Sequence, residues 1–229
     1  MRQIKIDPRV GKVCISSLAS LAGPAIFVLV AGVLGSLQPS YNAYHQTVSA
    51  LVLGSFGWVQ TATFFIFGLL LWIFAWRIYA SLVNKNLILK IATALISAVG
   101  AGFFIIGIFP TEPQGALSLN SIIHLDTVLV ISVMFTIVYF LLALSFKNDP
   151  FWRSMFIYTM ATAFIATVLI VIGIFWALDS NWTGIYERIF LINGLIWVEV
   201  VSLRLLTTCR THFQNCCKLN FGRKINSII

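Results

Sequence analysis

A histidine and a serine lie four residues apart in a short polar stretch between two long apolar runs. They are His45 and Ser49, and residues 38–57 that hold them also include Tyr41. Residues four apart share one face of a helix, so a short helix here would present both side chains together. Such a pair can act as base and nucleophile, and it can equally serve as a hydrogen-bonded cap. Both interpretations stay open.

The apolar residues of the same stretch predict where it lies. Tyr41, Tyr44, Val48 and Leu51 would give it an apolar face. A segment with one apolar face settles at an interface instead of extending into water. We therefore expect residues 41–51 to be ordered and to fold over the mouth of a helical bundle.

Ionisable groups near the start of two later apolar runs form a second set. His124 and Asp126 open one run, and Glu187 and Arg188 open the other. Asp126 lies roughly 7 Å below its helix start at 1.5 Å per residue, where an unpaired charge costs several kcal/mol. Arg188 gains nothing from the dipole of a helix N-terminus. We therefore expect an Asp126–Arg188 ion pair, which would either fix the register of two helices or anchor a phosphate or carboxylate.

Two further carboxylates complete the ionisable set. Glu112 lies in the polar connection that precedes His124. Glu199 follows Glu187 in the same run, roughly 18 Å deeper by helical rise. Because carboxylates at such a depth often mark proton or ion routes, we expect Glu199 to be protonated or paired with another helix.

These polar residues converge on one side of the predicted membrane protein and define its candidate site. The candidate ligand-binding residues are Tyr41, His45, Glu112, His124, Asp126, Glu187 and Arg188. If the site is catalytic, the candidates are His45, Ser49, His124 and Asp126. Histidines and carboxylates can bind zinc, but the set lacks a short-range pair of the kind that helical metal sites use. The sequence therefore predicts no particular metal site and leaves the cofactor open.

Six apolar runs must position these residues. They are residues 13–37, 58–80, 88–110, 121–145, 153–178 and 186–206. Each is long enough for a helix that crosses the hydrocarbon core, and none alternates as the strands of a membrane barrel do. Hydrophobic residues make up 59% of the chain and charged residues 10%, against about 25% charged in soluble domains. The sequence predicts an all-α membrane bundle of six transmembrane helices.

The basic residues predict how the chain threads through the membrane. If the ends of the runs are included, all but one of the 15 Lys and Arg residues lie before the first run, around the end of the last, or at alternate connections, and Arg188 is the exception. Basic residues near spans stay on the cytoplasmic side, so both termini are expected there. This distribution also accounts for the net charge of +8. No nucleic-acid-binding motif accompanies the charge.

The same pattern divides the chain into three parts. Residues 1–12 form a cytoplasmic segment, residues 13–206 the transmembrane domain, and residues 207–229 a basic cytoplasmic tail. The tail lacks helical periodicity, so we expect it to lie along anionic headgroups. Its cysteines, Cys209, Cys216 and Cys217, match no standard zinc spacing.

Three short motifs resemble a known family. They are Tyr41-Asn42 through His45 and Thr47-Val48-Ser49 before Gly57-Trp58, then Phe109-Pro110-Thr111-Glu112-Pro113 before His124, and Glu187-Arg188. Together they resemble the six-span bacterial membrane family called domain of unknown function 998. The resemblance covers about residues 15–206. It implies six helices, an external polar cluster and a bacterial plasma-membrane location, and it implies no established reaction.

The leading functional hypothesis is an integral membrane protein whose outward-facing polar pocket binds a small molecule or a lipid headgroup. One alternative is an intramembrane hydrolase that uses His45, His124 and Asp126, with or without a metal. Others are a structural or accessory membrane subunit, and a proton-coupled transporter with Glu199 as its proton site.

Overall fold

Six long helices make up the computed structural model, which describes the backbone of residues 8–113, 118–177 and 181–225 and the side chains of residues 16–113, 118–175 and 181–207. The helices are α1 (Pro8–Leu37), α2 (Gly57–Ser81), α3 (Leu87–Ile108), α4 (Leu119–Lys147), α5 (Phe156–Ile172) and α6 (Thr183–Ile225). Three short helical segments join them: η1 (Ser49–Leu53), η2 (Arg153–Met155) and η3 (Gly173–Ala177).

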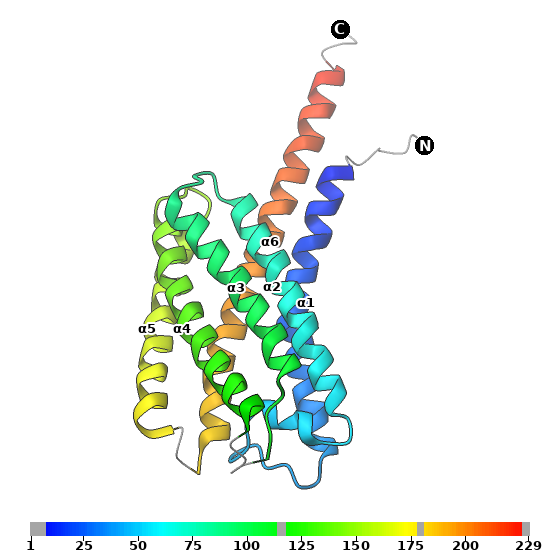
Figure 1. Cartoon of the computed structure of the whole chain (residues 1–229). Helices are drawn as coiled ribbons and strands as arrows, with labels where there is room; N and C mark the ends of the chain where they lie inside the picture. The colour runs from blue at the N-terminus through cyan, green and yellow to red at the C-terminus, as the bar shows by residue number, and fades with distance from the viewer. Residues whose placement is uncertain (1–7, 114–117, 178–180, 226–229) are drawn as a thin grey trace.

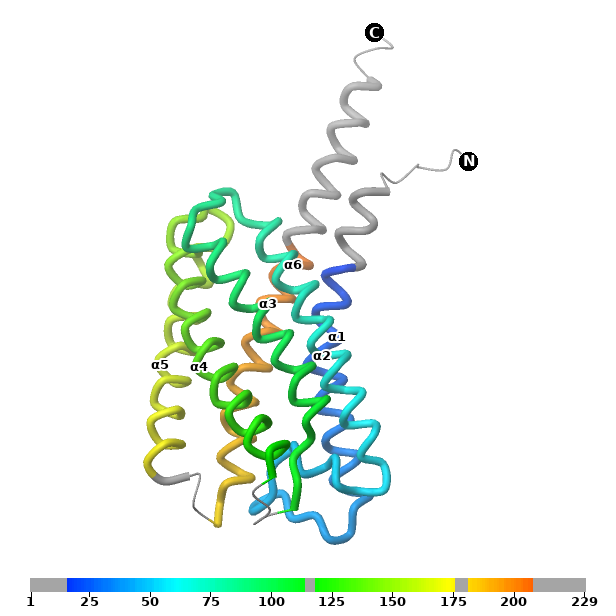
Figure 2. Tube along the Cα trace, in the orientation of Figure 1, coloured from blue at the N-terminus to red at the C-terminus, as the bar shows by residue number. Residues whose placement is uncertain are grey.

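The helices run alternately up and down and close into a ring (Figure 1). Each helix packs against the next one in the chain, and α6 returns to pack against α1. Helix α1 begins and α6 ends at the same end of the bundle, which we call the terminal end (Figures 1 and 2). The opposite end carries residues 38–56 and the connections that lead into α4 and α6, and we call it the loop end.

The outer faces of the ring are apolar. Leu29, Ile157 and Phe164 are 67%, 76% and 60% exposed, and many other large apolar side chains are exposed beside them. A water-soluble monomer rarely presents so extensive an apolar surface. The described residues include six helical spans of 22–29 residues that are apolar enough to cross a membrane, and the fifth of them joins α5 with η2 and part of η3. The prediction of an all-α, six-span integral membrane protein is confirmed.

The last helix is longer than the sequence indicates. Helix α6 has 43 residues and continues to Ile225, so the backbone is helical well into residues 207–229 although their sequence lacks helical periodicity, and the placement of this segment as a cytoplasmic tail stays a prediction. The side chains of Cys209, Cys216 and Cys217 lie outside the described residues. The cytoplasmic location of the two termini stays a prediction.

Helices α2 and α3 approach each other closely at two glycines. A Cβ atom on Gly68 would lie 2.7 Å from the carbonyl oxygen of Gly100, and one on Gly100 would lie 2.9 Å from the carbonyl oxygen of Gly68. Small residues allow backbones to approach in this way and increase dispersion contacts between membrane helices. Gly68 and Gly100 are therefore packing positions between the two helices.

We expect Gly68→Ala to lower the free energy of unfolding by about 1–3 kcal/mol, because the new methyl group meets backbone atoms that cannot rotate away. Alanine otherwise favours a helix over glycine by about 1 kcal/mol. Gly32→Ala is the matched control, since nothing lies within 4 Å of its added Cβ. Thermal unfolding in detergent should therefore shift in opposite directions. Equal or stabilising effects at both sites would contradict the close approach.

Candidate functional site

Residues 38–56 fold across the loop end of the bundle instead of extending away from it. Val48 and Leu51 are 5% and 1% exposed and belong to the hydrophobic core. Tyr41 packs against that core, while Tyr44 is 52% exposed. The expectation of an ordered segment over the mouth of the bundle is thus confirmed, except that Tyr44 does not contribute to its apolar face.

Arg188 holds this segment to the first turns of α6. Its Nη1 donates hydrogen bonds to the carbonyl oxygens of Ala43 at 2.7 Å, Gln46 at 2.8 Å and Gly184 at 2.8 Å. Its Nη2 donates to the hydroxyl of Tyr41, and the guanidinium lies 5.5 Å from the centre of the Tyr41 ring. One cationic side chain therefore fixes the loop at several points.

Backbone contacts reinforce the attachment. The amide of Ile185 donates to the carbonyl oxygen of Tyr44 at 3.1 Å. A Cβ atom on Gly184 would collide with the carbonyl oxygens of Ala43 and Gln46, so only glycine allows the loop to approach this closely. We call this contact between residues 41–48 and residues 184–188 the loop clamp.

The expected ion pair between Asp126 and Arg188 is wrong. Arg188 directs its donors at backbone carbonyls and the Tyr41 hydroxyl, and no ion pair joins it to Asp126. Carbonyl oxygens satisfy a guanidinium without a carboxylate, because it has five N–H donors and needs acceptors more than a formal countercharge. Asp126 is exposed instead of buried.

Tyr41 stays neutral in the loop clamp. Burial raises the pKa of the Tyr41 phenol, and the nearby Arg188 opposes that shift. The hydroxyl donates to the carbonyl oxygen of Thr47 at 2.8 Å while it accepts from Arg188. A neutral phenol can do both at once, so Tyr41 serves as a joint between the two segments.

His45 and Ser49 do not form the catalytic pair that their spacing suggests. His45 is exposed, and its Nδ1 contacts the carbonyl oxygen of Asn181. Ser49 is buried and starts η1. No hydrogen bond joins the two side chains among the described residues, because the chain turns at residues 43–46 and does not form one continuous helix through both.

His124 occupies a structural position. It is 2% exposed, and its Nδ1 lies 2.8 Å from the carbonyl oxygen of Phe109, where α3 has just ended. This contact fastens the first turns of α4 to the end of α3. The Nε2 atom of His124 is buried and has no hydrogen-bond partner among the described residues.

A cavity of about 500 Å³ lies inside the ring. All six helices and η1 contribute to its wall, with a larger share from α4 and α6. Aromatic side chains from five helices line it, among them Phe27 of α1, Phe67 of α2 and Phe103 of α3, whose ring centroids lie 4.9–6.5 Å apart. A volume of this size is in the usual range for a small-molecule site, about 300–1,000 Å³.

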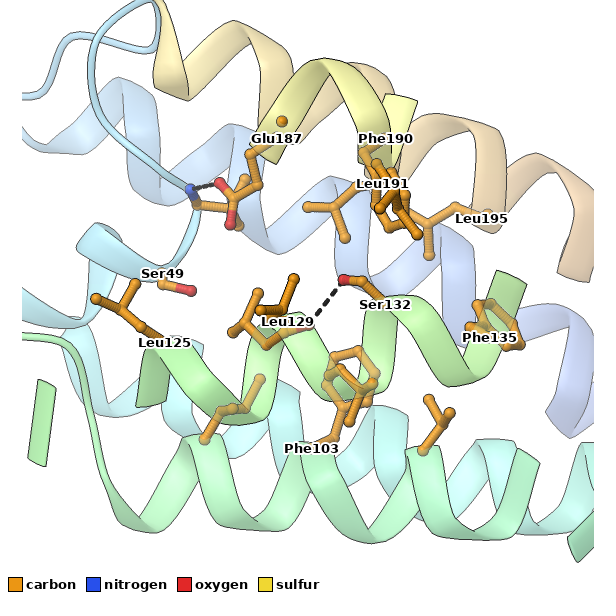
Figure 3. Close-up of a pocket in the computed structure, with 18 of the residues that line it drawn as sticks. Ser49, Phe103, Leu125, Leu129, Ser132, Phe135, Glu187, Phe190, Leu191 and Leu195 are labelled. Atoms are coloured by element: carbon orange, nitrogen blue, oxygen red, sulfur yellow. Dashed lines mark hydrogen bonds between the residues drawn. The ribbon is translucent and has the colours of Figure 1, made fainter. Parts of the chain in front are cut away.

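The two carboxylates of the cavity lie toward the loop end, whereas the hydroxyl-bearing Ser132 and Tyr139 lie farther along α4. Ser49, Asp126 and Glu187 line it there, and Figure 3 shows Ser49 and Glu187 at one end with Phe135 and Leu195 toward the other. One carboxylate oxygen of Glu187 accepts a 2.5 Å hydrogen bond from the amide of Val48. The loop clamp thus also positions a carboxylate beside the cavity.

The remaining candidates lie apart from this cavity. Glu112 and His124 do not line it, nor does Glu199, whose neighbours Leu195 and Val198 do. The Oε2 atom of Glu199 is buried without a hydrogen-bond partner among the described residues. In the same part of the chain, no group of three or more His, Cys, Asp or Glu side chains is placed to hold a metal ion.

Sequence reasoning missed two features. One is the aromatic wall of the cavity, because those rings come from helices that are apolar on every face and give no periodic signal. The other is Asp149, which is 2% exposed and accepts hydrogen bonds from the amides of Val83 at 2.8 Å and Phe151 at 2.9 Å. Asp149 therefore joins two connections at the terminal end. Its position after Asn148 and before Pro150 indicates a turn, but not this cross-link.

Comparison with known proteins yields one match. The model of the family described as protein of unknown function (DUF998) matches residues 21–204, which include four of the six spans completely and most of the first and the last. No curated protein and no solved structure matches the chain.

Proposed function

The chain belongs to the DUF998 family, and on that premise we propose that this integral membrane protein binds a small amphiphilic molecule or a lipid headgroup in the cavity inside its ring of helices. The apolar part of the ligand lies among the aromatic side chains, and its polar group lies at the loop end beside Ser49, Asp126 and Glu187. The ligand binds reversibly and is not changed chemically.

The distribution of polarity along the cavity supports this proposal most directly. Both carboxylates of the wall lie at one end, while the remainder is mainly apolar and carries only the hydroxyls of Ser132 and Tyr139. Small-molecule sites combine an apolar wall with a few placed polar groups in this manner, because the wall gives affinity and the polar groups fix orientation. An amphiphile matches both parts at once.

The loop clamp supports the same proposal. It is assembled from the connection between α1 and α2 and from the start of α6, and it brings Val48 and Ser49 to the cavity. A binding site whose residues are already held in place loses less conformational entropy when the ligand binds. We propose that Arg188 acts in this way, as a positioning residue and not as a ligand anchor.

A test uses dodecanol, which has a single hydroxyl and one alkyl chain. We expect radiolabelled dodecanol to bind saturably to the purified protein in lipid nanodiscs, with about one molecule per protein. Leu191→Trp should abolish that binding, because Leu191 lines the cavity and the larger indole fills it. Leu203→Trp on the outer face of the same helix, where the side chain is 48% exposed, is the matched control and should bind normally.

Thermal unfolding of each variant separates a filled cavity from a misfolded protein. If Leu191→Trp unfolds early, Ser132→Phe repeats the test from α4, which lines the opposite part of the wall. Saturable binding that survives in folded cavity-filling variants would place the ligand elsewhere and overturn the proposal.

We also propose a location and an orientation for the protein: it lies in a bacterial plasma membrane with its loop end outside the cell. The connections at the terminal end carry Lys85, Lys147 and Arg153, while Arg188 is the basic residue near the loop end among the described residues. Basic residues that flank spans remain on the cytoplasmic side.

A further inference from the structure

We propose that the cavity selects amphiphiles whose headgroup is a protonated amine on a single alkyl chain, with Asp126 and Glu187 as the recognising groups. This inference rests on the proposed function and adds the chemical class of the ligand. The headgroup donates N–H hydrogen bonds to the two carboxylates, and its chain extends along the aromatic wall.

The charge of the cavity wall carries the argument. Two of its described lining residues, Asp126 and Glu187, have carboxylate side chains, and none is Lys or Arg. Asp126 is exposed and Glu187 is half-buried, and a carboxylate that is partly removed from water, as Glu187 is, is costly unless a cation or several donors accompany it. The protein supplies one donor to Glu187, the amide of Val48. A ligand with a cationic N–H group would supply the rest.

The side chain of Arg188 makes its hydrogen bonds in the loop clamp and not in the cavity. Arg188 follows Glu187 directly, yet adjacent residues on a helix point about 100° apart. Its guanidinium is already engaged by Ala43, Gln46, Gly184 and Tyr41. Moving it into the cavity would break those bonds and open the loop clamp. Arg188 interacts electrostatically with Glu187, but it does not line the cavity, and its N–H donors are used in the loop clamp instead of offering a site for a phosphate headgroup.

The volume of the cavity limits the size of the ligand's apolar part, and the carboxylates of its wall limit the kind of headgroup. A cavity of about 500 Å³ corresponds to one drug-sized molecule, which favours a single chain over a lipid with two. Amine donors give directional hydrogen bonds to carboxylates, and such charge-assisted bonds are about twice as strong as neutral ones. A quaternary ammonium has no N–H group and therefore cannot form these hydrogen bonds.

The test compares three probes that share one alkyl chain: dodecylamine, dodecanol and dodecyl sulfate. Binding is measured on the whole protein in nanodiscs of constant lipid composition. We expect dodecylamine to bind about 10-fold more tightly than dodecanol, the low end for a hydrogen bond to a charged group, and dodecyl sulfate to bind most weakly. Dodecyltrimethylammonium separates charge alone from N–H donation and should bind less tightly than dodecylamine.

Asp126→Asn combined with Glu187→Gln removes both charges and keeps the shape and the acceptor oxygens. We expect this variant to lose the roughly 10-fold preference for dodecylamine while its affinity for dodecanol changes less than about 3-fold. Arg153→Gln, a charge change at the exposed terminal end, is the control for general electrostatic effects and should keep the preference.

The outcomes distinguish the two proposals. If none of the probes binds saturably, or if binding survives in Leu191→Trp, the proposed function itself fails. If the probes bind in the cavity but the amine has no advantage over the alcohol, or the double variant keeps that advantage, amphiphile binding stands and the selectivity inference is overturned. Tighter binding of a phosphatidylethanolamine with two chains than of dodecylamine would also overturn the single-chain inference.

Discussion

Truncating Trp197 to alanine is expected to lower the free energy of unfolding by about 3–5 kcal/mol, the usual range for a buried tryptophan. Trp197 is 0% exposed, and its Nε1 donates to the hydroxyl of Thr159 at 3.2 Å. Its ring packs edge-on against Phe74, Phe135 and Tyr139 at centroid distances of 5.7, 5.9 and 4.9 Å. One side chain of α6 thereby contacts α2, α4 and α5.

Reversible unfolding in mixed micelles measures this effect. Trp58→Ala is the matched control, because Trp58 is 71% exposed and its loss should change the free energy of unfolding by about 0.5 kcal/mol or less. Trp197→Phe should cost less than the alanine change, since it mainly removes the hydrogen bond to Thr159. A loss below about 1 kcal/mol for Trp197→Ala would show that α6 does not depend on this contact.

Replacing Arg188 by methionine is expected to release residues 41–48 from α6 and to lower the free energy of unfolding by about 2–4 kcal/mol. Hydrogen bonds to charged groups contribute about 1.5–3 kcal/mol each and are not additive. Arg188 makes four such bonds, and those to the carbonyl oxygens of Ala43 and Gln46 and to the Tyr41 hydroxyl attach the loop to α6. Val48, now 5% exposed, should become accessible.

Labelling of Val48→Cys, in a chain whose native cysteines are replaced by serine, measures that release directly. The labelling rate should rise in the Arg188→Met background, and Arg153→Met should leave it unchanged. Gly184→Ala tests the loop clamp independently and should raise the same rate, because its methyl group collides with Ala43 and Gln46. Exchanging the two charges, Asp126→Arg together with Arg188→Asp, should not restore the slow labelling rate. A restored slow rate would show that these two residues form an ion pair, contrary to the structure.

The spans could be predicted from the sequence because their physical cause is local. A run of about 20 apolar residues has few alternatives to a membrane helix, and the observed bounds of α2 and α3 lie within two residues of the predicted runs. The end of α6 could not be predicted from apolarity, since the helix continues where the chain becomes polar. Its backbone hydrogen bonds need no apolar side chains once the helix has been started.

The end of the bundle at which the polar residues lie was predictable, but their contacts were not. Tyr41, Ser49, Asp126, Glu187 and Arg188 all lie at the loop end, as their positions near the starts of spans indicated. Which of them meet depends on the path of residues 38–48, and the decisive partners of Arg188 are carbonyl oxygens, which every residue carries. Pairing of side chains by charge alone pointed to Asp126 as the partner of Arg188 and overlooked these carbonyl acceptors.

The two halves of the loop clamp are separated by most of the chain, and this separation sets the order in which the protein can be completed. Ala43 and Arg188 are 145 residues apart, so translation at about 5–20 residues per second leaves a delay of roughly 7–30 s between them. During that interval, residues 41–48 have been synthesised but their partner on the last helix has not. A nascent or truncated chain without α6 therefore presents unpaired backbone groups and the apolar side chains of Val48 and Leu51, a surface by which cellular quality control can tell an unfinished molecule from a finished one.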